Sequence, residues 1–252
     1  SQGGSAGPPM QITLDRLQIT DTIALTDLTG TFDTRRGLDG AFQARLNGQT
    51  PVSGRVVPQN GRSAFQISSN DGGRVLAAAG LLKNAAGGEM TLTLAPAKAA
   101  GTYNGALDIK NTRLRDAPAM AALLNAASVI GLLEQLGGQG ISFNQVEARF
   151  QMTPKQVIVS RSSAVGASMG ISMDGYYNLA SGQMDMQGVV SPFFLVNGIG
   201  AIFTRKGEGL VGFNYKLNGT GAQPKVKVNP LSIFTPGMFR EIFRRPPPEV
   251  NR

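Results

Sequence analysis

The stretch Gly166–Gly170, with the sequence GASMG, matches the G-x-S-x-G pattern that holds the nucleophilic serine of many hydrolases on a sharp turn. In that role Ser168 needs a histidine as its base, and the chain contains no histidine. The stretch also leads into an alternating apolar and polar run rather than into a helix. These observations disfavour a serine hydrolase, and we expect a protein that is not an enzyme.

The other residue types used in catalysis and metal binding are equally scarce. Without histidine or cysteine the common zinc sites are excluded, and without cysteine there is no disulfide framework. Two acidic pairs, Asp15 with Asp21 and Asp174 with Asp185, are interpreted as solvated residues at strand edges. No acidic run has the spacing of a calcium loop, and no glycine-rich phosphate-binding motif occurs. We therefore expect neither a metal nor a cofactor.

The charge balance is positive, with 24 Lys and Arg against 16 Asp and Glu and a net charge of +8. Such a balance suits a membrane surface or nucleic acid as partner. The basic residues are scattered, and the one dense group is Arg240, Arg244 and Arg245. Nucleic-acid platforms interleave aromatic and basic residues, but the tyrosines of this chain lack adjacent arginines. We expect no nucleic acid as partner.

Alternation of apolar and polar residues dominates from Met10 onward and predicts about a dozen half-buried β-strands. The 33 glycines are interpreted as residues of tight turns. Hairpin signals separate the runs at Asn60-Gly61, Gly87-Gly88, Ser181-Gly182 and Asn218-Gly219. Runs so closely spaced predict an antiparallel meander in one domain, residues 10–245, with a linker before it (1–9) and a proline-rich tail after it (246–252).

Three or four short helices are expected to interrupt the strands. Asp71 is predicted to cap a helix that ends at Leu82. Asp116 is predicted to cap the longest helix, in which apolar residues recur at helical spacing until Gly137-Gly138. A third helix is expected after Pro192.

The fourth helix is expected from Pro236 to Arg245. Its apolar residues, including Phe239 and Phe243, share one face, and the three arginines Arg240, Arg244 and Arg245 flank it. The segment is therefore predicted to be a small basic amphipathic helix. It either plugs the end of the sheet or contacts a membrane or a partner protein.

The apolar faces of a dozen strands exceed what four short helices can cover. Either the sheet folds back into a closed sandwich or barrel, or it curls into an open trough. Methionines in several strands suit an adaptable lining, although ordinary core packing explains each of them equally well. The candidate lining residues are Leu107, Ile109, Phe150, Met152, Met169, Ile171, Met173, Met184, Met186, Phe213, Tyr215 and Leu217.

Two stretches carry a family resemblance, namely DGYYNLASGQMDMQGVVSPFFLVNGIGAIF and GEGLVGFNYKLNGTGAQPKVKVNPLSIFTPGMFREIF. The most specific residues in them are Pro192, Asn197, Asn229, Pro230, Pro236 and Gly237, together with Arg240. With these features the chain resembles the C-terminal region of the AsmA-like proteins, and it is nearest to their YhdP-type branch. The resemblance covers nearly all of residues 10–245.

This resemblance implies a fold and a function. AsmA-like proteins are thought to be inner-membrane-anchored bridges in the periplasm of Gram-negative bacteria. Their long, curved antiparallel sheet forms an open apolar groove that shelters the acyl chains of phospholipids on the way to the outer membrane. The chain is then expected to be the distal, lipid-conducting part of such a bridge, with phospholipid acyl chains and the bacterial membrane surface as partners. The alternative is a closed β interaction domain that docks an outer-membrane or periplasmic protein through its C-terminal helix.

Overall fold

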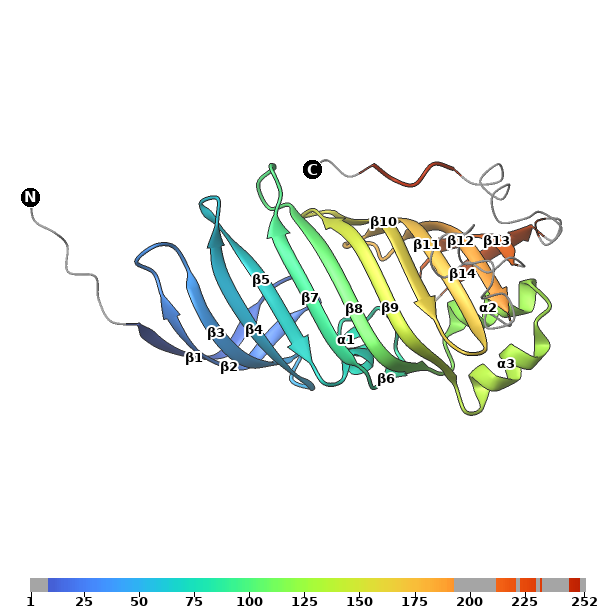
Figure 1. Ribbon diagram of the computed structural model, residues 1–252, viewed down its shortest axis with the longest axis horizontal. Helices are drawn as coiled ribbons and strands as arrows, with labels where there is room; N and C mark the ends of the chain where they lie inside the picture. Colours follow the sequence, from blue (N-terminus) through green and yellow to red (C-terminus); the bar gives the residue numbers. More distant parts are fainter. Residues whose placement is uncertain (1–8, 193–211, 221–222, 230–231, 233–244, 250–252) are drawn as a thin grey trace, which may run out of the picture.

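The structure is a computed structural model that describes residues 9–192, 212–220, 223–229, 232 and 245–249. In these residues the chain forms one antiparallel sheet of 14 strands and three helices (Figure 1). The prediction of a mainly β, antiparallel domain is thus confirmed. The strands are β1 (Met10–Gln18), β2 (Ala24–Asp33), β3 (Asp39–Leu46), β4 (Thr50–Gln59), β5 (Arg62–Ser69), β6 (Ala85–Ala86), β7 (Glu89–Pro96), β8 (Tyr103–Leu114), β9 (Ile141–Met152), β10 (Gln156–Val165), β11 (Met169–Asn178), β12 (Met184–Pro192), β13 (Phe213–Gly219) and β14 (Pro224–Asn229).

The sheet is an open meander. Each strand pairs with the next one along the chain, except that the short β6 pairs with β8 and leaves β5 beside β7. In Figure 1 the strands follow one another as a slanted ribbon, with the blue β1 at one end. No pairing joins β1 to β14 in the described part of the chain. These strands therefore do not form a closed barrel, which was one of the alternatives that the sequence allowed.

Asn-Gly turns set the register of two neighbouring hairpins. Asn60 and Gly61 have φ of 51° and 73° between β4 and β5, the left-handed pair that a two-residue hairpin needs, so this prediction is confirmed. Asn47 and Gly48 also have positive φ, 49° and 72°, in the three-residue loop between β3 and β4, where Leu46 pairs with Thr50. The predicted hairpin at Gly87-Gly88 is wrong, because it joins β6 to β7 and these strands do not pair.

Helix α1 (Gly72–Ala78) begins where the sequence predicts. The side chain of Asp71 accepts a hydrogen bond from the backbone N–H of Arg74, which confirms the cap. The helix ends four residues before the predicted end at Leu82. Gly87 and Gly88 do not form a hairpin because their carbonyl oxygens bind the start of α1. The carbonyl of Gly87 accepts from the N–H of Gly73 over 2.9 Å, and the carbonyl of Gly88 accepts from the N–H of Gly72 over 2.7 Å.

The predicted single helix after Asp116 is wrong, because the segment forms two helices, α2 (Pro118–Ala126) and α3 (Ile130–Gly137). Ser128 has a φ of 57°, which turns the chain between them. Asp116 is not the cap: Ala117 holds that position without a side-chain hydrogen bond, and Pro118 supplies a φ already suited to the first turn. The break lets both helices bury leucines in the same cluster, namely Leu123, Leu124, Leu132 and Leu136. The helices predicted after Pro192 and from Pro236 to Arg245 lie outside the described residues, apart from Pro192 and Arg245 themselves.

The buried apolar residues form two clusters. The first joins Val75 of α1 with residues of β2 to β4, β7 and β8, and includes Phe32, Phe42 and Val56. The second packs α2 and α3 against the later strands and includes Met169 and Val190. Helix α1 contacts β4 and β6 to β8 near the centre of the sheet, and α2 lies against β14, the last strand. The helices therefore cover parts of one face rather than its whole length.

Several glycines lie inside strands, opposite large apolar side chains. A Cβ at Gly54 would lie 2.1 Å from the ring of Phe42, and a Cβ at Gly105 would lie 2.2 Å from the ring of Phe150. Each glycine is directly opposite its aromatic partner in the strand register. The rings therefore lie over the backbone of the neighbouring strand, in space that any side chain would fill. The interpretation of glycine as a turn residue is wrong at these positions.

This packing predicts the cost of filling the space. Gly105→Ala is expected to lower the free energy of unfolding by about 1–3 kcal/mol, because the Phe150 ring must move. Gly131→Ala in α3 is the control, since nothing lies within 4 Å of a Cβ there. Urea unfolding followed by circular dichroism measures both. Equal midpoints for the two variants would show that the ring does not occupy this space.

Candidate functional site

The strand register lines up apolar residues in rows that run across the sheet. Residues directly opposite one another on neighbouring antiparallel strands point to the same side of the sheet. Two such rows cross all the strands of the main path. The central row is Ile12, Gly30, Phe42, Gly54, Ile67, Leu92, Leu107, Ala148, Ser162, Met173, Gly188, Tyr215 and Val228. The flanking row is Met10, Phe32, Gly40, Val56, Phe65, Leu94, Gly105, Phe150, Val159, Gly175, Met186, Leu217 and Val226.

Neither row contains a charged residue. The only polar side chains in them are those of Ser162 and Tyr215, and both hydroxyls donate to the backbone. Ser162 donates to the carbonyl of Met173 over 2.8 Å, and Tyr215 donates to the carbonyl of Ser172 over 2.9 Å. Both hydroxyls therefore have hydrogen-bond partners within the sheet and do not need water as a partner.

The twelve residues predicted to line a groove all lie on this face. Leu107, Met173 and Tyr215 belong to the central row, and Phe150, Met186 and Leu217 to the flanking row. The others lie on either side of these rows, in register with them: Ile109, Ile171, Phe213, Met152, Met184 and Met169. The sequence therefore brought together residues that share one face, while their role as a lipid lining stays a prediction.

Burial along the rows is uneven. Both rows are buried near β3 and β4, at Phe42 and Val56, and again near β12 and β13, at Met186 and Tyr215. Between these ends the side chains are only half-buried. We call this stretch the middle patch, and it consists of Phe65, Ile67, Leu92, Leu94, Leu107, Ala148, Phe150 and Val159.

The helices account for part of this burial. A Cβ on Gly72 at the start of α1 would lie 2.7 Å from the Cβ of Met90 and 2.9 Å from Ile109, so α1 covers residues of β7 and β8 beside the central row. Towards β14, α2 and α3 pack into the cluster that buries Met186 and Tyr215. The middle patch lies beside the residues that α1 covers, on β5 and β7 to β10, and keeps part of its apolar surface exposed.

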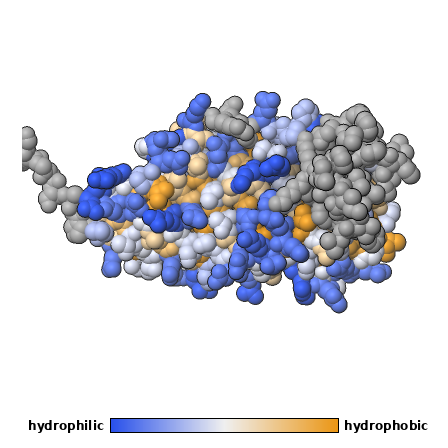
Figure 2. Space-filling view, in the orientation of Figure 1, coloured by the Kyte–Doolittle hydropathy of each residue, from blue (hydrophilic) through white to orange (hydrophobic). Residues whose placement is uncertain are grey.

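The opposite face of the sheet is polar. In the middle of the sheet its neighbouring residues include Thr91, Asp108 and Glu147, which lie opposite one another on three strands. Figure 2 shows one side of the molecule, on which hydrophilic and intermediate residues predominate and hydrophobic residues form separate patches. The alternation in the sequence thus separates one uncharged face from one polar face.

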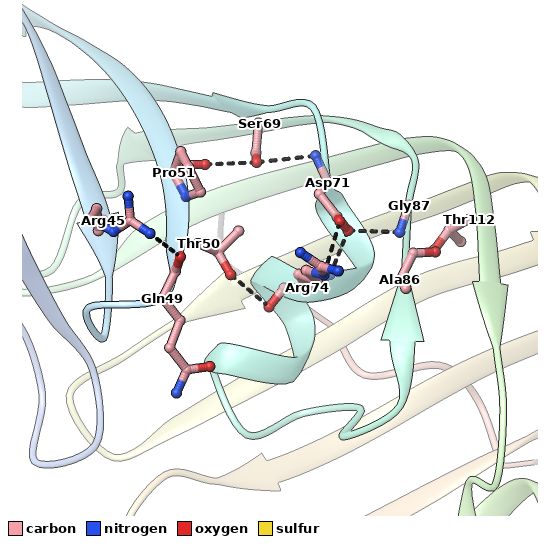
Figure 3. A network of polar contacts seen from close by, with 10 residues as sticks. All are labelled: Arg45, Gln49, Thr50, Pro51, Ser69, Asp71, Arg74, Ala86, Gly87 and Thr112. Atoms are coloured by element: carbon pink, nitrogen blue, oxygen red, sulfur yellow. Dashed lines mark hydrogen bonds and ion pairs between the residues drawn. The ribbon is translucent and has the colours of Figure 1, made fainter.

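A polar network fixes α1 in place over the sheet (Figure 3). One carboxylate oxygen of Asp71 accepts from the N–H of Arg74 over 2.9 Å and from the N–H of Gly87 over 2.6 Å. The hydroxyl of Ser69 accepts from the N–H of Asp71 and donates to the carbonyl of Pro51 over 2.8 Å. Helix α1 is therefore tied to β4 and to the turn before β7, and it lies over Met90 and Ile109 of the apolar face.

A recess of about 420 Å³ lies beside this network, between α1, the turn before β4, and β6. Its lining includes the cations Arg74 and Lys83 and no carboxylate. Both side chains are exposed, and Arg74 already pairs with Asp71 at 3.3 Å. Because water and salt screen exposed charges, the recess offers an anion little binding energy.

The structure also bears on the catalytic and metal readings. Ser168 lies in the turn between β10 and β11, and strand β11 begins at the next residue, so the strand-to-helix turn of the hydrolase motif is not formed here. Within residues 9–192 and the shorter described segments, no group of three or more acidic side chains is arranged to hold a metal ion. In the same residues no helix is long and apolar enough to span a bilayer.

The interpretation of Asp174 as a solvated residue is wrong. Its exposure is only 2%, and its carboxylate accepts a hydrogen bond from the side-chain amide of Gln187 over 2.9 Å. Both residues lie on the polar face of β11 and β12, so that face is covered at this end of the sheet. Asp185 stays partly exposed, as predicted, and its carboxylate forms a two-point ion pair with Arg245 over 2.8 and 3.0 Å.

The predicted C-terminal contact residues are described only in part. Arg245 is bonded to Asp185, whereas Phe239, Arg240, Phe243 and Arg244 lie outside the described residues. Of the residues that carry the family resemblance, Pro192 pairs with Met169 and Asn229 pairs with Asn214. Asn197, Pro230, Pro236 and Gly237 lie outside the described residues.

Comparisons of this chain with protein-family models, with curated proteins and with solved structures find no match.

The ion pair of Asp185 predicts a dependence on pH. The guanidinium of Arg245 lowers the pKa of the Asp185 carboxyl below its ordinary value of 3.8. The amide of Asn218 and the charge of Lys216 also lower this pKa, whereas burial raises it. Asp174 and Tyr176 also face Arg245. A carboxyl whose pKa is lower in the folded chain stabilises the fold above its unfolded pKa, and this contribution is lost as the pH falls through the folded pKa.

We therefore expect the contact between Asp185 and Arg245 to persist at neutral pH and to be lost in acid below pH 3.8. Titration of the Asp185 carboxyl carbon by NMR measures the midpoint. Arg245→Ala should raise that midpoint, because the largest cause of the shift is removed. A midpoint that Arg245→Ala leaves in place would contradict the ion pair.

Proposed function

We propose that the apolar face binds the acyl chains of phospholipids and conducts them without catalysis. The observation that carries this proposal is the pair of uncharged rows that cross the main path of the sheet, with a middle patch left half-buried beside the residues that the helices cover. A hydrocarbon chain laid over the middle patch would remove both its own surface and that of the patch from water.

The energy of such binding is large enough to matter. Burial is worth about 0.8 kcal/mol per CH₂ group, so an acyl chain of about sixteen carbons gains up to roughly 12 kcal/mol relative to water. Over the middle patch the gain is similar from strand to strand, because all of its side chains are apolar and half-buried. A guest chain can then move along the patch without leaving a deep site.

The length of the rows suits conduction rather than storage of one ligand. The main path contains 13 strands and therefore twelve steps between strands. At about 4.8 Å a step, the rows extend over about 58 Å along the sheet. Their half-buried part is the middle patch on β5 and β7 to β10, and there the headgroup can stay in solvent while the acyl chain lies on the patch.

The place of this activity comes from the family resemblance. On that basis we propose that the chain works in the periplasm of a Gram-negative bacterium, as part of an inner-membrane-anchored bridge that moves phospholipid between the inner and outer membranes. A membrane surface would supply and receive the lipid. A docking role toward an outer-membrane or periplasmic protein is the competing function, and it would use protein contacts instead of the apolar rows.

Photo-crosslinking from the two faces separates these functions. A benzoylphenylalanine in place of Phe150, in the middle patch, is expected to crosslink phospholipid when the protein is purified from cells. Benzoylphenylalanine in place of Tyr176 is the control. Tyr176 is 40% exposed on the polar face, and this position is expected to give no phospholipid crosslink. Mass spectrometry identifies the adducts. Protein adducts without lipid at position 150 would favour the docking role and reject the lipid proposal.

A charge on the middle patch should weaken lipid binding. Phe150→Asp places a carboxylate among apolar side chains, and an acyl chain covering it would have to strip its water. Thr93→Asp is the control, because Thr93 is exposed on the polar face of β7. Native mass spectrometry should find co-purified lipid with Thr93→Asp and much less with Phe150→Asp, both variants being folded by circular dichroism. Equal lipid content in the two would count against the patch as the binding surface.

A further inference from the structure

A second site lies on the polar face of the sheet, at β12. Here Gln187 and Asp185 hold Arg245, a residue 58 and 60 positions further along the chain. The side-chain amide of Gln187 donates to the carbonyl of Arg245 over 2.7 Å and accepts from its N–H over 3.0 Å. This is the two-way pairing that a residue receives from a neighbouring β-strand, supplied by a side chain.

The site is prearranged by its neighbours. Asp174 is 2% exposed, and its carboxylate accepts from the nitrogen of the Gln187 amide over 2.9 Å. A carboxylate can only accept, so this bond turns the amide oxygen toward the N–H of Arg245. The side-chain amide of Asn218 donates a hydrogen bond to the Asp185 carboxylate over 2.9 Å. This bond orients the carboxylate that binds the guanidinium of Arg245. Two-point bonding between a carboxylate and a guanidinium is selective for arginine over lysine.

The occupant has a defined chemistry as well. Pro246 follows Arg245 and has no backbone N–H. The backbone donor and acceptor that the segment presents to Gln187 are therefore the N–H and the carbonyl of Arg245. Residues 245–249 form neither helix nor strand, and three consecutive prolines keep this segment extended. The ligand is thus an extended peptide that carries arginine directly before proline.

We propose that Asp185 and Gln187 form a binding site for an arginine-containing extended peptide, and that the C-terminal segment of the same chain occupies it as a clasp. The clasp holds that segment on the face opposite the apolar rows, since Asp185 and Gln187 alternate with Met184 and Met186 along β12. It is independent of the lipid proposal, because it uses the other face and other residues.

Distance measurement by electron paramagnetic resonance tests the clasp in the full chain. The chain has no cysteine, so Thr93→Cys and Glu249→Cys supply two unique positions for spin labels, one on β7 and one beside Arg245. We expect a narrow distance distribution in this background and the loss of the narrow peak with Asp185→Ala. The Asp185 side chain is 47% exposed, so its removal should leave the sheet folded, which circular dichroism checks.

Two further variants make the result decisive. Exchange of the charges, Asp185→Arg with Arg245→Asp, should restore the narrow peak. Asp33→Ala is the matched control, because it removes an exposed pair with Arg35 at the other end of the sheet and should leave the peak unchanged. A peptide with the sequence of residues 243–249, added in excess, should broaden the distribution by taking the site. A peak that stays narrow in Asp185→Ala, or that the peptide leaves narrow, would overturn the proposal.

Discussion

A sheet with one apolar face must keep that face out of water, and a single layer of strands cannot do so by itself. The described part of this chain supplies three short helices for the task. They cover only parts of the face: α1 covers the residues around Ile109, on β8 near the centre of the sheet, and α2 with α3 covers those around Met186, on β12. Beside these covered residues the middle patch stays half-buried. The proposed function depends on this shortfall, because guest hydrocarbon can complete what the helices leave uncovered.

The glycines inside the strands determine what kind of surface this is. Gly54 and Gly105 leave room for the rings of Phe42 and Phe150 over the neighbouring strand. Glycine paired with an aromatic ring across strands is a known way to pack a strand position that has no side chain of its own. These contacts pack rings of both rows against the sheet itself.

Alternation in the sequence was enough to predict the strands, because each strand has one apolar and one polar face. It also placed the twelve candidate lining residues on one face, since each of them belongs to the apolar set of its own alternating strand. It missed the glycines in strand interiors, because composition alone favours turns for them. The break at Ser128 carried no proline or glycine signal. The burial of Asp174 depends on contacts between residues distant in the sequence, which no local pattern reports.

The two apolar rows end differently at β1 and at β14. At β14 the helix α2 lies against the last strand, and on the polar face nearby Arg245 is bonded to β12. At β1 the rows end in Ile12 and Met10, and Met10 is 49% exposed. In the described residues no strand pairs with the outer edge of β1, which has no proline to block pairing. Of the two ends, β1 is thus the one whose backbone groups are placed to accept a further strand and to continue both rows.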